Sequence, residues 1–220
     1  MDRVALGRMQ NPVRGILHGS AALLSIAGAV LLVELSRNRS LRIALFIYGF
    51  SLVGLYLTSA LYHSVPWGTT WRARFQRLDH TMIHILVAGT CTPLLIAVLD
   101  GRWLRFGLAM MWGLAGVGAL REFFPRLRRP WSLGLQLLIG ATALGPLGMV
   151  LMRIEKVPLI LTLGGGVIYL VGLVAFVTGR PRLSPRIFSH HEMWHLVVII
   201  ASAAHFLAVW LVVGGRLPSI

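Results

Sequence analysis

Seven long apolar runs dominate this sequence. Each is about 20 residues long, the length that an α-helix needs to cross the roughly 30 Å hydrocarbon core of a bilayer. Transmembrane β-strands need only about ten alternating residues, so the length of the runs argues against a β-barrel. The sequence therefore predicts an all-α fold, a polytopic bundle of seven transmembrane helices. The expected helices are residues 16–35, 41–62, 79–99, 103–120, 131–151, 157–178 and 192–213.

The composition agrees with a chain that lies in a membrane over most of its length. Of the 220 residues, 56% are hydrophobic and only 13% are charged, and the mean hydropathy is +0.76. Because the runs and their short connections use up the chain, we expect one transmembrane domain over 16–214, with a short segment 1–15 before it and a tail 215–220 after it. The only cysteine, Cys91, lies within the third run, which excludes an intrachain disulfide and a cluster of cysteine ligands.

Basic residues lie at the ends of the apolar runs rather than along one stripe. The formal net charge is +14, but a nucleic-acid-binding protein gathers such charge on one face, so we expect no nucleic-acid partner. Short loops rich in arginine and lysine are favoured on the cytoplasmic side. With the N-terminus inside, thirteen basic residues fall inside and eight outside. We therefore expect a cytoplasmic N-terminus, an external C-terminus and membrane lipids as partners.

Ionisable side chains gather at one end of the predicted bundle. Such groups are costly within membrane spans and are functional candidates by default. The second run ends, and the third and seventh runs begin, on the same side of the membrane, whichever way the chain is oriented. Five polar side chains at these three ends therefore share one depth: Ser59, His63, Asp79, His191 and His195.

Two pairs at this depth have the spacing that places both side chains on one face of a helix. Ser59 and His63 are four residues apart, and so are His191 and His195. Three imidazoles suit a tetrahedral zinc ion that keeps one open position. We therefore predict a metal site with three ligands: His63, His191 and His195. Asp79 would lie near the metal, either as a group that supports the ligands or as a base that holds a water. Ser59, one turn deeper, would orient that water or a substrate carbonyl.

Other histidines near this end leave alternatives open. His80 and His84 form another pair with four-residue spacing, on a face turned about 100° from Asp79, and could replace or join the ligands. His18 could approach the site or simply face the lipid headgroups. A single histidine at a helix end is more often interfacial than a ligand, so the prediction depends on the whole set. Three imidazoles also suit nickel, cobalt or copper.

The segment His191-Glu192-Met193-Trp194-His195 matches H-E-x-x-H, the zinc motif of metalloproteases, in which the glutamate is the general base. An intramembrane protease of this kind also needs a later helix with an Asn-Pro…Leu-Asp-Gly motif. The chain's Leu-Asp-Gly, at 99–101, comes before the segment and at the opposite membrane face, and its only Asn-Pro is at 11–12. The protease interpretation is therefore disfavoured, and Glu192 remains a secondary candidate.

Four stretches, in order, resemble the hemolysin III branch of the progestin and adipoQ receptor family, which includes the adiponectin receptors and is similar to the alkaline ceramidases. They are HGSAALLSIAG, SALYHS, LDHTMIHILVAGTCTP and FSHHEMWHLVVIIASAAHF. The resemblance implies a bacterial-type plasma membrane protein with zinc ligands at His63, His191 and His195. It also implies a water-binding acid at Asp79 and a helix-two serine at Ser59. Relatives can have glutamine in place of Glu192, so we do not expect an essential base there.

Site and resemblance together predict a metal-dependent hydrolase that acts on a lipid amide or ester, because an open position on zinc at headgroup depth would meet a lipid's polar linkage. The alternative is a non-enzymatic regulator of membrane state, or a membrane-lytic protein, in which zinc ties helices together. A channel is disfavoured because the spans lack a continuous polar stripe. We do not expect this chain to be a hormone receptor, because the receptor members of the family have a long soluble N-terminal region. Small-residue helix faces permit a homo-oligomer without requiring one.

Overall fold

The computed structural model describes residues 9–34, 36–124, 145–180 and 188–214. Within these ranges six helices are long and apolar enough to cross a membrane. They are α1 (Pro12–Glu34), α2 (Arg39–Ser64), α3 (Thr69–Val98), α4 (Gly101–Phe123), α6 (Lys156–Thr178) and α7 (His190–Gly214). The chain is therefore an all-α polytopic helical bundle, as predicted.

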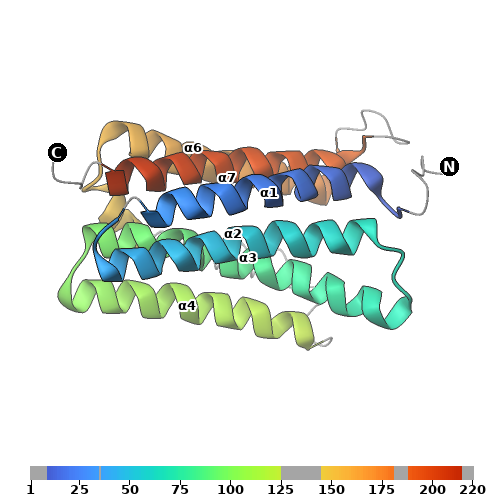
Figure 1. Ribbon diagram of the computed structural model, residues 1–220, viewed down its shortest axis with the longest axis horizontal. Coiled ribbons are helices and arrows are strands. Elements are labelled where there is room, and N and C mark those ends of the chain that lie inside the picture. Colours follow the sequence, from blue (N-terminus) through green and yellow to red (C-terminus); the bar gives the residue numbers. More distant parts are fainter. Residues whose placement is uncertain (1–8, 35, 125–144, 181–187, 215–220) are drawn as a thin grey trace.

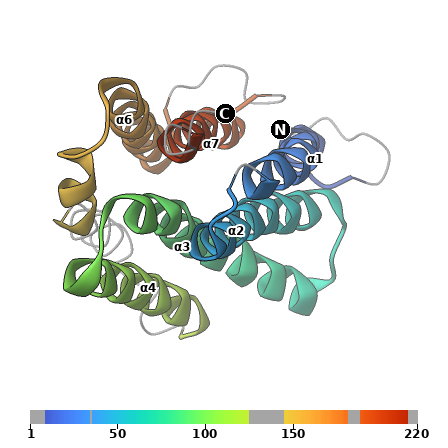
Figure 2. The ribbon, with the colours of Figure 1, turned by 60° about the vertical axis from the view of Figure 1, so that its left-hand side comes forward.

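The helices run side by side along the long axis of the molecule (Figure 1). Helices α1 to α4 pack each on the next along the chain, and α6 packs on α7. Helix α7 also contacts α1 and α3, so the last helix closes the bundle by packing against the first (Figure 2). This closure brings together the beginning of α1, the end of α2 and the beginnings of α3 and α7.

The outer surface carries apolar side chains that a soluble bundle would bury. Leu24 on α1 is 74% exposed and Val171 on α6 is 65% exposed, whereas Leu45, Leu95 and Val209 are fully buried inside. Contiguous exposed apolar surface of this extent needs a covering, and lipid tails supply it for a bundle whose backbone groups are paired within helices. The chain is a multi-pass membrane protein.

The predicted spans agree with the observed helices, with two qualifications. The fifth predicted run, 131–151, lies outside the described residues up to position 144, and its last part, 145–151, is helical. Helix α3 begins at Thr69, ten residues before the predicted start at 79. A hydropathy pattern detects only the part of a helix inside the hydrocarbon core, and a 30-residue helix, about 45 Å long, is longer than that core.

Small residues let neighbouring helices approach closely at two places where the sequence is rich in glycine. A Cβ atom added at Gly118 of α4 would lie 2.5 Å from His84 Nδ1 of α3, and one at Gly165 of α6 would lie 2.6 Å from His205 Nε2 of α7. His205 also hydrogen-bonds the carbonyl oxygen of Thr162 at 3.1 Å. Such small-residue contacts are the usual way in which transmembrane helices pack.

Candidate metal centre

Three histidines from α2 and α7 converge at one end of the bundle. One ring nitrogen from each of His63, His191 and His195 lies within 4.8 Å of the other two. The centroid of the His63 ring is 5.4 Å from that of His191 and 4.7 Å from that of His195. The rings of His191 and His195 stack at 5.1 Å. Among the described residues, no other group of three potential ligand side chains is close enough to hold a metal ion.

Local sequence signals place these histidines at helix ends. Helix α2 ends at Ser64 because Val65-Pro66 follows, and the residue before a proline avoids helical conformation. The backbone N–H of Asn11 donates to the carbonyl oxygen of His63 at 2.9 Å, which satisfies one of the free carbonyls at the end of α2. The segment that precedes α1 therefore helps to fix His63.

The beginning of α7 is fixed by a serine and a glutamate three residues apart. The Glu192 carboxylate accepts hydrogen bonds from the Ser189 backbone N–H, at 2.8 Å, and from the Ser189 hydroxyl. Ser-x-x-Glu is the signature of a capping box. The pattern Ser189-His190-His191-Glu192 was therefore a readable signal for the start of this helix, two residues before the predicted position 192.

His195 provides the test of whether these residues fit a metal ion. Its side chain is buried, and its Nδ1 lies 2.9 Å from Nε2 of His18. Its Nε2 is also buried and has no hydrogen-bond partner. A buried polar atom without a partner costs free energy, whereas a metal-ligating histidine commonly hydrogen-bonds through its other nitrogen. The cluster therefore fits a metal ion with Nε2 as the His195 ligand atom.

His18 of α1 belongs to the surroundings of this cluster rather than to the lipid interface. It is 3% exposed, and its ring centroid lies 4.1 Å from that of His195 and 5.0 Å from that of Tyr56. Of the two possibilities that the sequence left open for His18, the structure shows the approach to the site. Helix α1 thus contributes a side chain next to the three-histidine cluster, whose members come from α2 and α7.

Arg14 and Glu192 form a buried ion pair between α1 and α7. Arg14 Nε lies 2.7 Å from Glu192 Oε1, and the two side chains are only 6% and 7% exposed. The predicted N-terminal segment 1–15 contains Arg14, but α1 begins at Pro12, so Arg14 lies in the first turn of this helix and is buried. Glu192 links two helices, which distinguishes it from the base of a metalloprotease.

Asp79 and Ser59 meet at the contact between α3 and α2. Both side chains are buried, and the Ser59 hydroxyl lies close enough to the Asp79 carboxylate to interact with it. Ser59 precedes His63 by one turn of α2. The structure therefore places Asp79 beside the helix that carries His63.

His80 and His84 lie on the side of α3 that faces α4. His80 Nδ1 is 3.2 Å from Glu122 Oε2, and the buried His84 packs on Gly118. Neither is a member of the three-histidine group. The pairing with Glu122 could not be read from the sequence, because it depends on which face of α3 receives α4.

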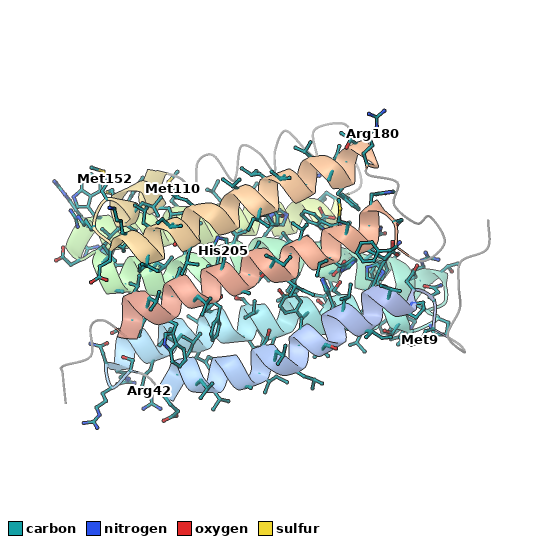
Figure 3. The ribbon with its side chains drawn as sticks, turned by 90° about the horizontal axis from the view of Figure 1, so that it is seen from above. Met9, Arg42, Met110, Met152, Arg180 and His205 are labelled. Carbon is teal, nitrogen blue, oxygen red and sulfur yellow. The ribbon has the colours of Figure 1, made fainter. Side chains whose placement is uncertain are left out.

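Figure 3 compares the end of the bundle that carries the three-histidine cluster with the middle of the bundle. Met9 and Arg180 lie at the same end of the molecule, whereas His205 lies about midway along α7. His205 is therefore remote from the cluster along its helix.

A bundle that faces lipid with apolar side chains and buries three histidines at one end defines a polytopic membrane protein with a candidate metal centre. The chain belongs to the Haemolysin-III related family, which matches residues 7–206. The family resemblance of the four stretches is thereby confirmed.

Sequence similarity to individual relatives extends over most of the chain. It is 33% identical to Hemolysin-3 of Bacillus cereus over 213 residues, which is 95% of this chain and 94% of that protein. It is 30% identical to the Hemolysin-3 homolog of Bacillus subtilis (strain 168) over 198 residues, 88% of this chain and 90% of that protein. The human monocyte to macrophage differentiation factor is 26% identical over 199 residues, 88% of this chain and 80% of its own length.

Replacing His18 with phenylalanine is expected to weaken metal binding about 10- to 100-fold without abolishing it, because His195 loses its hydrogen-bond partner while the ring volume is kept. A chelator competition titration on purified protein measures the change. His205→Phe, which alters a half-buried histidine midway along the same bundle, should leave the affinity unchanged. Equal affinities in all three proteins would show that His18 does not support the cluster.

Proposed function

We propose that this protein is an intramembrane zinc-dependent hydrolase acting on a lipid amide or ester. The observation that carries the proposal is the cluster of three buried or half-buried histidines, in which His195 Nε2 has no hydrogen-bond partner. Three protein ligands with one open position are typical of catalytic rather than structural zinc. When bound, zinc polarises a carbonyl group and makes a water nucleophilic at neutral pH.

The protein's own side chains have separable tasks in such a reaction. His63, His191 and His195 would hold the ion, and His18 would accept the hydrogen bond from His195 Nδ1. Asp79 would accept the proton that an attacking water loses as its oxygen bonds the carbonyl carbon. The same carboxyl group would return the proton to the nitrogen or oxygen that leaves. Ser59, which lies beside Asp79, would orient that carboxylate.

A lipid is the substrate class that the surroundings favour. The histidines lie in the end turns of transmembrane helices, so their depth is that of the headgroups and of the amide or ester linkages. Apolar side chains cover the outer surface, and a lipid can reach this depth without leaving the bilayer. With the cytoplasmic N-terminus that the basic residues predict, the site would open to the cytoplasmic leaflet of the plasma membrane.

The test is the lipid composition of cells that lack the protein. Such cells should accumulate a substrate lipid, and its level should return to normal with the wild-type protein but not with His195→Ala or Asp79→Asn. Identical lipid profiles in all four strains, with the variants present in the membrane at wild-type levels, would argue against hydrolysis.

A structural metal in a regulator of membrane state or a lytic protein is the second candidate. Helix α2 packs mainly on α1 and α3, whereas α7 packs mainly on α6, so an ion between His63 and the α7 histidines would tie together helices that share little other contact. The relatives named hemolysin favour a lytic action. A structural metal predicts a wild-type phenotype for Asp79→Asn and loss of the phenotype for His195→Ala.

A further inference from the structure

A cavity of about 470 Å³ opens beside the histidine cluster. Its walls come from the segment before α1, the beginning of α1, the last turn of α2 and the first turns of α3 and α7. The side chains that matter for its chemistry are Arg14, Tyr62, His63, Arg72 and His191. Two of the three clustered histidines therefore face a space large enough for part of a lipid headgroup.

The lining of this cavity carries positive charge and no carboxylate among the described residues. The charge of Arg14 is countered by Glu192 at 2.7 Å. Arg72, which is exposed in the first turn of α3, forms no ion pair with a residue that the structure describes. An arginine in this position presents a planar fork of donors suited to a phosphate oxyanion.

Aromatic side chains beside Arg72 mark the depth of the membrane interface. The rings of Trp67 and Phe75 stack at 4.1 Å, and the Arg74 guanidinium lies 4.8 Å from the ring centroid of Trp71. Tryptophan and arginine side chains at helix ends gather at the level of the lipid headgroups. The cavity therefore opens where phosphate groups of a bilayer lie.

We propose that the cavity binds a phosphate group through Arg72, so that the substrate of the hydrolase is a phosphate-bearing amphiphile. The assignment of this ligand as substrate rests on the proposed function, whereas its binding does not. The anion can come from a phospholipid headgroup or from free inorganic phosphate, because both present the same oxygens to Arg72. The linkage to be cleaved would then lie toward His63 and His191, at the inner end of the cavity.

Native mass spectrometry of the full-length protein, purified without chelators in detergent, tests this proposal. The probes are palmitoyl-oleoyl phosphatidylglycerol, the matching diacylglycerol, which lacks the phosphate, and inorganic phosphate. The wild-type protein should bind phosphatidylglycerol about tenfold more tightly than the diacylglycerol. Arg72→Gln should remove this preference and Arg72→Lys should retain part of it. Arg74→Gln is the matched control, because it removes an equal charge two residues away, outside the cavity, and should keep the preference.

The lipid probes and inorganic phosphate distinguish the two sources of phosphate. Arg72-dependent preference for phosphatidylglycerol identifies a lipid headgroup, whereas Arg72-dependent binding of inorganic phosphate without lipid preference identifies free phosphate. Equal binding of both lipids by wild type, with no phosphate bound, overturns the proposal. Metal content of the same samples separates the two hypotheses: bound metal without Arg72-dependent anion binding refutes this inference alone, and Arg72-dependent binding without metal refutes the zinc site alone.

Discussion

Replacing Glu192 with glutamine is expected to lower the free energy of unfolding by about 3–5 kcal/mol, the cost of leaving one partner of a buried ion pair without its counter-charge. Arg14 would keep its charge while 6% exposed, and the capping contacts to Ser189 would weaken at the same time. Thermal unfolding of the detergent-purified protein measures the loss.

Two controls show whether the burial of the ion pair causes the expected loss of stability. The double substitution Arg14→Met/Glu192→Met removes both charges and should recover much of the stability, because well-packed apolar residues often replace a buried pair without loss. Glu34→Gln breaks a pair with Arg42 that is 3.8 Å long and largely exposed, and it should change stability little. A Glu192→Gln protein as stable as wild type would contradict the linking role. Such stability combined with lost turnover would return Glu192 to the role of a base.

Replacing Asp79 with asparagine is expected to reduce turnover of the accumulated lipid by about 10²- to 10⁴-fold, the usual contribution of a general base, while the metal content stays at the wild-type level. Asparagine has nearly the same volume and keeps a polar oxygen beside Ser59, but it cannot accept the proton of a water. The measurement is the initial rate of hydrolysis of that lipid in reconstituted vesicles.

Asp100→Asn is the matched control for this substitution. Asp100 is the N-cap residue of α4, on the opposite side of the predicted membrane, and its replacement should leave the rate unchanged. Wild-type turnover by Asp79→Asn would exclude Asp79 as the base. Loss of bound metal in this variant would instead indicate that Asp79 supports the histidine cluster.

The transmembrane architecture could be predicted because the bilayer sets both the length and the composition of a helix that crosses it. The start of α3 could not, because Trp71, Arg72 and Arg74 lie beyond the apolar stretch and give no hydropathy signal. Helix boundaries there follow from backbone hydrogen bonding, which continues through polar and aromatic residues alike. For the same reason the predicted N-terminal segment 1–15 includes Arg14, which belongs to α1.

The sequence predicted that His63, His191 and His195 lie at the same depth in the membrane, but it could not predict which helix faces meet. Membrane crossing fixes the side on which each helix ends, and four-residue spacing fixes which side chains share a face. Which face meets which neighbour depends on packing over the whole bundle. The sequence therefore could not decide that His18 approaches His195 while His80 turns toward Glu122 of α4.

Metal content of the purified protein tests most directly the claim that three histidines at one end of the bundle hold an ion. Plasma mass spectrometry on protein prepared without chelators should find about one zinc per chain in the wild type and only background in His191→Ala/His195→Ala, since the double substitution removes two of three ligands. His205→Ala, which removes a half-buried histidine outside the cluster, should retain the metal. A wild-type protein without zinc or any other transition metal would contradict the metal centre, and with it the proposed hydrolysis.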